Sequence, residues 1–380
     1  MEIAIFGAGI AGLMTAIALR AQGHRCRIFE RMRQGHETGM GFILMPEGID
    51  CLQSFGVKLT GENSGATLQR YLCRSSTGQI LYEQPLPPGT RSIRRRQLID
   101  ALMGALPAGS SPVFDAELAG LDFDDAGNVT QARLNTGATL QADLYVSAEG
   151  IRSRARQSLY PGWPAPQAQV LEIVGMVQCK STVRWASNNF NKFHAVSGGI
   201  ALGTLAVDAE HVIWYIQFDS ARFPQPPDDG DFAEARRAFV TSLVGDWADP
   251  IPHLLSITDF SRTHLWRPLD TDLVPSFYRG NLVLVGDAAH PLSPFTSQGV
   301  SSAVSDAVAL AENLRPENLQ TQADLEHALA RYSQERREQC APYVDKGREL
   351  TRHFLTPQIG STILLPMAVS NRAEEGSFSD

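Results

Sequence analysis

The chain has 380 residues, of which 43% are hydrophobic and 19% charged, a composition that excludes a largely disordered protein and suits a globular enzyme. Its 33 basic and 41 acidic side chains give a net charge of −8, which argues against nucleic acid or an anionic membrane surface and favours a small-molecule partner. The five cysteines show neither CxxC nor metal-ligand spacing, so we expect reduced thiols and no metal site. Since neither a signal region nor a membrane span is evident, we expect a cytoplasmic location. We also expect a monomer or homodimer.

The first 30 residues predict two strands joined by a turn and a helix. An apolar strand ends at Phe6, and apolar residues then recur at about 3.6-residue spacing as far as Ala21. A second strand follows and ends on an acid, Glu30. This is the context in which a glycine-rich turn binds a dinucleotide.

The turn itself contains Gly7, Gly9 and Gly12. In a dinucleotide-binding turn the first glycine permits the tight bend, the second lets the pyrophosphate approach the backbone, and the third lets the helix pack on the strand. The phosphate then faces the helix N-terminus. Glu30 would bind a ribose hydroxyl pair, and an acid at this position favours FAD or NAD over NADP.

Strands and helices alternate over the following part of the chain. Three consecutive arginines, Arg94 to Arg96, precede one of the predicted helices. They form either a solvated basic helix start or a group from which one guanidinium reaches the bound phosphates or flavin. The predicted elements are a helix at 46–55, a hairpin within 66–83, a helix at 98–106 and strands at 114–125, 129–134 and 140–146.

Residues 165–277 are dominated by β-branched and aromatic side chains, which predict a largely antiparallel sheet with one face that covers something. Aromatic residues on such strands are more often core than ligand contacts. The candidates for substrate contact are Phe42, Phe193, Trp214, Tyr215, Phe218 and Phe295.

A second anchor follows residue 280. An apolar strand ends on Gly286-Asp287, and a helix with an apolar face begins near Val300. A carboxylate at the end of a strand can bind the polyol of a cofactor, and the helix N-terminus can face an electron-accepting ring. Residues 325–354 predict a long amphipathic helix, and the polar tail beyond Ser370 is predicted to be disordered.

Four motifs in this order resemble the class A flavoprotein monooxygenases, the para-hydroxybenzoate hydroxylase-like family. They are Gly7-x-Gly9-x-x-Gly12, Arg95-x-x-Leu98, Glu149-Gly150 followed by Ser153 and Arg156, and Gly286-Asp287-Ala288-Ala289-His290. The resemblance implies an α/β fold with a Rossmann-like FAD-binding domain, an inserted, mainly antiparallel β-sheet substrate domain and a C-terminal helix. The implied segments are 1–70, 91–164 and 278–325 for the FAD-binding domain, 71–90 (a hairpin) and 165–277 for the substrate domain, 326–369 for the helical region and 370–380 for the tail.

The same resemblance implies FAD as the cofactor, NADH or NADPH as a transient reductant, and O2 as a co-substrate. The enzyme would hydroxylate or epoxidise an aromatic or other electron-rich small molecule through a flavin C4a-hydroperoxide. The implied catalytic positions are Pro294, Gln298 and Gly299. The implied cofactor-binding residues are Gly7, Gly9, Ala11, Gly12, Glu30, Arg31, Arg95, Gly286, Asp287, Gly299 and Val300.

Three positions depart from the family pattern: Glu149 replaces Asp, Ser297 replaces Gly and Ser301 replaces Asn. FAD binding tolerates these changes more easily than hydroxylation does. Two alternatives therefore stay open, a related reductase or oxidase without oxygen insertion and a non-catalytic flavin-binding protein. His290 is a candidate base, although a structural role is favoured over proton transfer.

Overall fold

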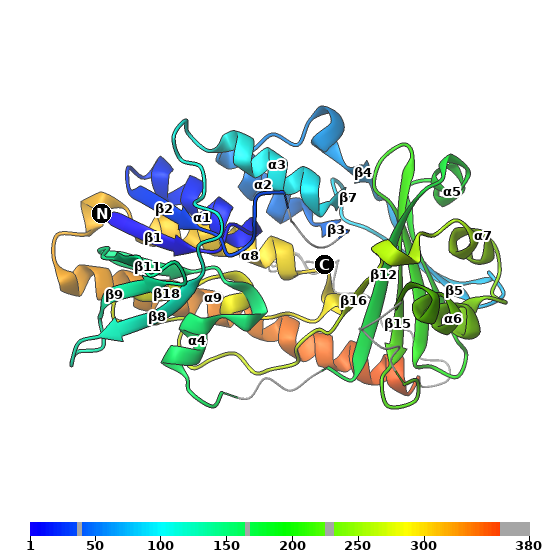
Figure 1. Ribbon diagram of the computed structural model, residues 1–380. Coiled ribbons are helices and arrows are strands. Elements are labelled where there is room, and N and C mark those ends of the chain that lie inside the picture. Colours follow the sequence, from blue (N-terminus) through cyan, green and yellow to red (C-terminus); the bar gives the residue numbers. More distant parts are fainter. Residues whose placement is uncertain (36–39, 164–167, 225–231, 358–380) are drawn as a thin grey trace, which may run out of the picture.

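The computed structural model describes residues 1–35, 40–163, 168–224 and 232–357. A mainly parallel sheet lies at one end of the molecule and a larger, mainly antiparallel sheet at the other (Figure 1). Helix α8 (Gly299–Asn313) lies between them, and helix α9 (Gln322–Leu355) runs along both. The tail predicted from residue 370 lies outside the described residues, as does 358–369 of the predicted helical region.

The first sheet brings three of the sequence motifs to one edge. Its strands are, in spatial order, β17 (Tyr278–Arg279), β18 (Leu282–Leu284), β11 (Leu144–Ser147), β1 (Glu2–Phe6) and β2 (Arg25–Phe29). All pairings are parallel except that of β17 with β18. The carboxyl ends of β1, β11 and β18 therefore lie side by side, and the chain leaves them through Gly7, Glu149 and Gly286. Ligands bind at this edge in open α/β sheets.

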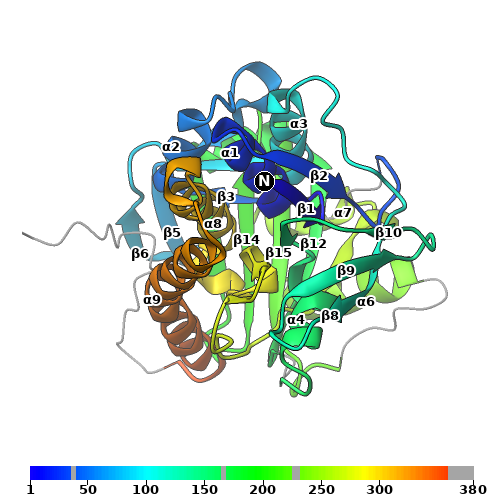
Figure 2. The same cartoon turned by 90° about the vertical axis from the view of Figure 1, so that its left-hand side faces the viewer.

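Helices cover this sheet because their apolar faces match it. Helix α1 (Ile10–Ala21) buries Leu13, Met14 and Ile17 against the strands, in one core with Val304 of α8. At the far side, the Tyr332 hydroxyl of α9 donates to the Leu284 carbonyl oxygen at 2.9 Å. Viewed from the end of the molecule, α9 lies on one side of this sheet and strands β8 and β9 on the other (Figure 2).

The strand predicted at 140–146 is two strands. Residues Thr139–Leu140 form β10, which pairs antiparallel with β9 (Val129–Leu134) beside β8 (Leu118–Phe123), whereas β11 pairs with β1. Asp143 between them accepts a hydrogen bond from the Glu2 backbone nitrogen at 2.7 Å. The prediction was wrong because a polar interruption sends the chain from one sheet into another.

The second sheet has seven strands, and all pairings except β13 with β5 are antiparallel. Its strands are, in order, β16 (His264–Trp266), β12 (Val170–Gln178), β15 (His211–Asp219), β14 (Ile200–Ala206), β13 (Asn189–His194), β5 (Arg70–Ser75) and β6 (Ile80–Pro85). The predicted hairpin is the β5–β6 pair. Side chains alternate between faces along each strand, so one face builds a core and the other borders the space before the first sheet.

Helices α5 (Lys180–Ala186), α6 (Phe232–Val244) and α7 (Ile251–Ser256) belong with the second sheet. A core of Trp214, Phe218 and Val240 joins α6 and α7 to the sheet. The remaining helices and strands are α2 (Pro46–Ser54), α3 (Arg95–Ala105), α4 (Arg154–Leu159), β3 (Gly41–Leu44), β4 (Ala66–Thr67) and β7 (Arg91–Arg94). Within the described ranges, no helix is long and apolar enough to cross a membrane.

Candidate active site

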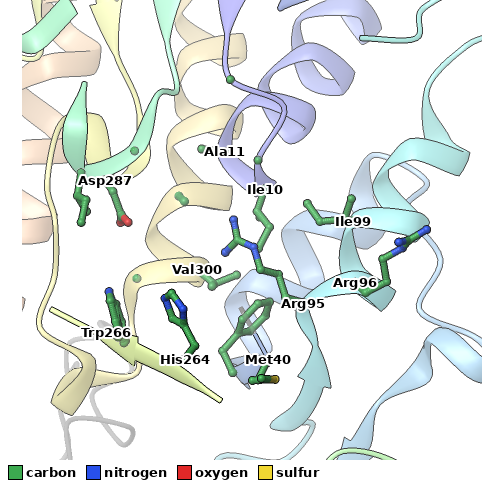
Figure 3. A pocket seen from close by; sticks show the side chains of 18 of the residues that line it. Ile10, Ala11, Met40, Arg95, Arg96, Ile99, His264, Trp266, Asp287 and Val300 are labelled. Carbon is green, nitrogen blue, oxygen red and sulfur yellow. The ribbon is translucent and has the colours of Figure 1, made fainter. Parts of the chain in front are cut away.

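A cavity of about 1080 Å³ extends from the glycine turn after β1 to the inner face of the seven-stranded sheet. Side chains from α1, α3, β16 and α8 line it (Figure 3). Residues more than 280 positions apart in the chain, such as Gly7 and Val300, therefore border one space.

The glycine turn fits a ligand that approaches the backbone. A Cβ atom on Gly7, whose φ is +106°, would lie 2.3 Å from the Ala148 carbonyl oxygen, and one on Gly12 would lie 1.9 Å from the Gly7 oxygen. Gly9 differs, since a Cβ there would meet only Arg95, at 3.7 Å. Gly7 and Gly12 thus permit close backbone packing, while Gly9 leaves open the position where a pyrophosphate would approach α1.

Glu30 lies beside this turn at the end of β2. Its carboxylate accepts hydrogen bonds from the backbone nitrogens of Ala8 at 2.7 Å and Met32 at 2.8 Å. Glu30 and Arg31 both line the cavity. The carboxylate therefore braces the turn, and its remaining lone pairs suit the hydroxyl donors of a ribose.

The three consecutive arginines take three different positions. Arg94 forms an ion pair with Asp208 at 3.4 Å, and Arg96 forms one with Asp100 at 2.9 Å. The Arg95 guanidinium instead points into the cavity near Ile10, whereas the Arg96 side chain, at the edge of the lining, points away from Arg95 (Figure 3). The geometry therefore favours the interpretation in which one guanidinium reaches a bound anionic group.

The departure at Glu149 has a structural explanation. The carboxylate accepts hydrogen bonds from the hydroxyls of Ser147 at 2.7 Å and Ser153 at 3.1 Å, and from the backbone nitrogens of Arg154 and Ala155 at 3.2 and 3.1 Å. The longer side chain is thus used to cap α4, which stabilises the helix N-terminus.

The loop after β18 is held by a buried charged network. Asp306 of α8 accepts hydrogen bonds from the Gly286 nitrogen and His290 Nε2, both at 2.6 Å, and from Arg336 Nε at 2.7 Å. Burial would raise the pKa of Asp306, but His290 and Arg336 together lower it. His290 is 1% exposed and is absent from the cavity lining among the described residues. This placement gives His290 a structural role.

Asp287, next in the loop, lines the cavity opposite Arg95 (Figure 3). Burial raises the pKa of its carboxyl against the attraction of His290, Arg95 and Arg156. Gly286 itself faces α1, where a Cβ would lie 2.9 Å from the Ala11 Cβ. Gly286 therefore allows the loop to pack closely against α1, and Asp287 places its carboxyl group in the cavity.

The segment before α8 brings several predicted residues to the cavity. Pro294, Gly299 and Val300 line the cavity. Gln298 is the buried N-cap residue of α8, and among the described residues it is not part of the cavity lining. Ser297 adopts a left-handed conformation with φ +54°, which explains why glycine suits this position.

Ser301 faces helix α2 rather than the cavity. Its hydroxyl accepts a hydrogen bond from the Met45 backbone nitrogen at 3.4 Å, and a Cβ on Gly48 would lie 2.9 Å from the same oxygen. The Asn-to-Ser departure at this position is therefore accommodated by close packing of α8 on α2.

The predicted substrate contacts divide between the two faces of the sheet. Phe42, Tyr215 and Phe295 line the cavity. Phe193, Trp214 and Phe218 are each fully buried in the core on the opposite face. The expectation that these three contact a substrate is therefore corrected, because strand alternation turns them away from the cavity.

Sequence reasoning missed a polar group on the cavity face. Glu172 of β12 lies opposite Gln217 of β15 in the strand register and accepts a hydrogen bond from Gln217 Nε2 at 2.5 Å. Lys192 of β13 places its Nζ 4.7 Å from the centroid of the Phe295 ring. All three side chains are less than 5% exposed. A charge within an otherwise apolar strand was the available signal.

Burial shifts the ionisation of this group toward neutrality. It raises the pKa of Glu172 to about 7, although Gln217 and Lys192 oppose that change. It also lowers the pKa of Lys192 to about 8, although Glu172 opposes that change. Titratable groups of this kind in a cavity are typical of functional sites.

The residues present fit FAD. The Gly9 backbone, the Glu30 carboxylate and Arg95 provide contacts suited to a pyrophosphate and a ribose, and Asp287 offers a second polar contact farther along the same cavity. A dinucleotide that reaches from Glu30 past Asp287 would leave the inner face of the second sheet for another molecule.

Comparisons with known proteins agree with this geometry. A family model described as FAD binding domain matches residues 1–346. The aurachin C monooxygenase/isomerase of Stigmatella aurantiaca is 29% identical over 356 residues, which cover 90% of this chain and 87% of that protein. The FAD-dependent urate hydroxylase of Mycolicibacterium vanbaalenii is 27% identical over 382 residues, 95% of this chain and 91% of that protein.

The fold is shared with solved structures. The structure of Klebsiella pneumoniae HpxO complexed with FAD and uric acid has a TM-score of 0.77 and 21% sequence identity, and the match covers 92% of this chain and 88% of that one. At this identity the similarity establishes the fold alone.

Proposed function

The chain belongs to the FAD-binding family of class A flavoprotein monooxygenases, and from this premise we propose that it hydroxylates or epoxidises a small aromatic or heteroaromatic molecule with NADH or NADPH and O2. It is a flavin-dependent oxidoreductase, and FAD is its cofactor. The observation that carries the proposal is the single cavity that joins the glycine turn to the aromatic and polar side chains of the second sheet.

We assign the FAD contacts to the residues at the first sheet. Glu30 would bind the adenosine ribose, the backbone at Gly9 and the N-terminus of α1 would bind the pyrophosphate, and Arg95 would neutralise its charge. Asp287 would bind a hydroxyl of the ribityl chain. When bound, FAD supplies the electron transfer and the oxygen activation.

The protein's own contribution is position and exclusion of water. Helix α8 begins at Gly299, which lines the cavity, so the partial positive charge of the helix N-terminus would stabilise an anionic ring bound beside it. Pro294 and Phe295 border the space between that ring and the sheet. A substrate held against Tyr215 would thereby lie close to the reacting part of the cofactor and out of bulk water.

Two relatives support a planar ring as the substrate. The Mycolicibacterium relative is named for hydroxylation of urate, and the HpxO structure contains uric acid. The aromatic side chains Phe42, Tyr215 and Phe295 offer apolar contacts for a ring of this kind. We also propose a cytoplasmic location and a monomer or homodimer.

Oxygen incorporation is the decisive test. Purified protein is expected to retain FAD, to oxidise NADH or NADPH faster when a substrate from a panel of phenols, indoles and heteroaromatics is added, and to transfer one atom of ¹⁸O2 into the product. NAD(P)H oxidation that yields only hydrogen peroxide with every substrate would overturn the proposal. Turnover of a substrate without O2 would instead favour the reductase alternative.

The non-catalytic alternative receives no support from the three departures. Glu149 caps α4, Ser297 occupies its left-handed conformation, and Ser301 packs against α2. None of these contacts blocks the cavity. Absence of flavin reduction by either nicotinamide would be the observation that favours that alternative.

A further inference from the structure

The inner face of the second sheet carries a specific arrangement of one cation, one amide and one carboxyl group. Lys192, Gln217 and Glu172 come from β13, β15 and β12, and all three line the cavity. Strands β12 and β15 are neighbours, but β14 lies between β15 and β13. The three side chains therefore face one cavity from either side of β14.

The middle strand, β14, carries two small residues, Ala201 and Gly203, between Lys192 and Gln217. Gly203 pairs with Lys192 on one side and with Tyr215 on the other. A Cβ on Gly203 would lie 2.3 Å from the Tyr215 ring, so the ring crosses the glycine toward Lys192, whose Nζ is 5.9 Å from its centroid. Ala201 likewise lies opposite Gln217.

The Gln217 amide has a defined orientation. Its nitrogen donates to Glu172 Oε1 at 2.5 Å, which leaves its oxygen directed elsewhere. That oxygen is buried and has no hydrogen-bond partner in the part of the chain that the structure describes. A buried acceptor without a donor destabilises a site unless a ligand supplies the missing hydrogen bond.

Lys192 is the matching donor. Its ammonium contacts the faces of Phe295 and Tyr215, and it forms no ion pair within 4 Å with any described residue. A cation between two aromatic faces remains able to bind an anionic oxygen above the sheet. Since Phe295 follows Pro294, such an oxygen would lie beside the segment that we assign to the flavin ring.

We infer that Lys192 and Gln217 select an aromatic substrate that presents an ionised ring hydroxyl to Lys192 and a second donor, N–H or O–H, to the Gln217 oxygen. Glu172 is a positioning residue that acts through Gln217 by fixing the orientation of its amide. The inference rests on the proposed function for the identity of this space as the substrate site. An ionised hydroxyl also enriches the ring in electrons, which suits it to accept an electrophilic oxygen.

Binding of coloured phenols to the FAD-loaded protein tests the inference without turnover. The probes are 4-nitrophenol, whose ionised form absorbs visible light, 4-nitrocatechol, which adds a second donor, and nitrobenzene, which lacks the hydroxyl. For the wild-type protein we expect bound 4-nitrophenol to be more ionised than free 4-nitrophenol at the same pH. We expect 4-nitrocatechol to bind about tenfold more tightly than 4-nitrophenol.

The variants separate the three roles. Lys192→Met is expected to weaken 4-nitrophenol binding about tenfold or more and to abolish the extra ionisation of the bound probe. Its affinity for nitrobenzene should stay within about twofold of wild type. Lys192→Arg should partly retain 4-nitrophenol binding and ionisation, because it keeps the positive charge. Gln217→Leu and Glu172→Gln are expected to remove the advantage of 4-nitrocatechol while 4-nitrophenol still ionises. Phe193→Leu, one residue from Lys192 on the opposite face, is the matched control and should bind all probes as the wild type does.

Three binding results would overturn the inference: wild-type protein that binds neither nitrophenol, Lys192→Met that binds and ionises 4-nitrophenol normally, or Glu172→Gln that keeps the full 4-nitrocatechol advantage. Failure of the proposed function is distinct, because it would appear as absence of ¹⁸O in every product while the probe binding still follows the variants. Conversely, oxygenation of a substrate without an ionisable group, with an unchanged KM in Lys192→Met, would overturn only the inference.

Discussion

At the first sheet the cavity borders a glycine turn whose backbone a ligand can approach, whereas at the second it is bordered by side chains from five different strands, β12 to β16. The turn after β1 depends on Gly7, Gly9 and Gly12, positions at which a side chain is excluded or would narrow the cavity. The site at the second sheet depends on the ammonium group of Lys192 and the amide group of Gln217. A backbone site tolerates little change and fits one cofactor, while a side-chain site can change its ligand by single substitutions without altering the fold.

The largest effect is expected from Gly7→Ala. The new Cβ would lie 2.3 Å from the Ala148 oxygen at a φ of +106°, so strain and overpacking together should lower the free energy of unfolding by about 2–6 kcal/mol. FAD should be lost on purification. Gly23→Ala is the control, because Gly23 has φ +85° but no atom within 4 Å; it should cost about 1–2 kcal/mol and keep FAD.

Urea denaturation and the flavin content of the purified proteins measure both outcomes. Equal losses for Gly7→Ala and Gly23→Ala would contradict the argument, since backbone strain alone would then account for the effect and the contact between β1 and β11 would contribute nothing.

Within the second sheet, the two faces of β13 should respond differently. Phe193→Ala removes a fully buried ring from the core shared with α6 and α7, and should lower the free energy of unfolding by about 3–5 kcal/mol. Binding of 4-nitrophenol by the protein that remains folded should stay within about twofold of wild type. A large change in probe affinity with little loss of stability would show that Phe193 faces the ligand after all.

Affinity for an anion should fall as the pH rises. Glu172, with a pKa raised to about 7 by burial, is uncharged at lower pH, and Lys192, with a pKa lowered to about 8, is then a cation. The pair therefore carries one positive charge below pH 7, none between the two values and one negative charge above pH 8. Binding of 2,4-dinitrophenol, which is ionised throughout, should weaken about tenfold or more from pH 6 to pH 9.

Other titratable groups near the pair do not reverse this expectation. Burial lowers the pKa of His194 to about 3, so it is neutral throughout, and burial raises the pKa of Cys73 and of Tyr215, so both stay protonated over most of the range. Fluorescence quenching of the bound flavin gives the dissociation constant at each pH. Glu172→Gln should remove the step near pH 7, and an unchanged profile in that variant would contradict the assignment.

The smallest effect is expected at Ser297. Because this residue has φ +54°, Ser297→Gly should raise the free energy of unfolding by about 0.5–1 kcal/mol. Asp115→Gly is the matched control, since Asp115 is exposed and has φ +56°. Both should be stabilised in thermal unfolding, but only Ser297→Gly should shift the absorption spectrum of the bound flavin. A flavin spectrum of Ser297→Gly identical to that of the wild type would show that Ser297 does not lie beside the cofactor.

The backbone end of the site could be predicted from sequence, and the side-chain end could not. Glycine spacing and a terminal acid determine the turn at Gly7 and Glu30 almost by themselves, because only those residues satisfy its geometry. The positions of Glu172 and Lys192 depend on a register that runs through four strands from β12 to β13, which local sequence does not specify. Trp214 and Phe218 were predicted as substrate contacts because the sequence does not show which face of their strand borders the cavity.

The buried contact of Asp306 with α9 bears on the order in which the protein matures. Asp306 is shared between Gly286 of the cofactor loop and Arg336 of α9. During synthesis the loop leaves the ribosome about 50 residues before its arginine partner does, as their positions in the chain show. During that interval Asp306, which holds the loop, would lack its ion pair with Arg336. FAD should consequently be taken up after α9 has docked, by a nearly complete chain rather than by a nascent one.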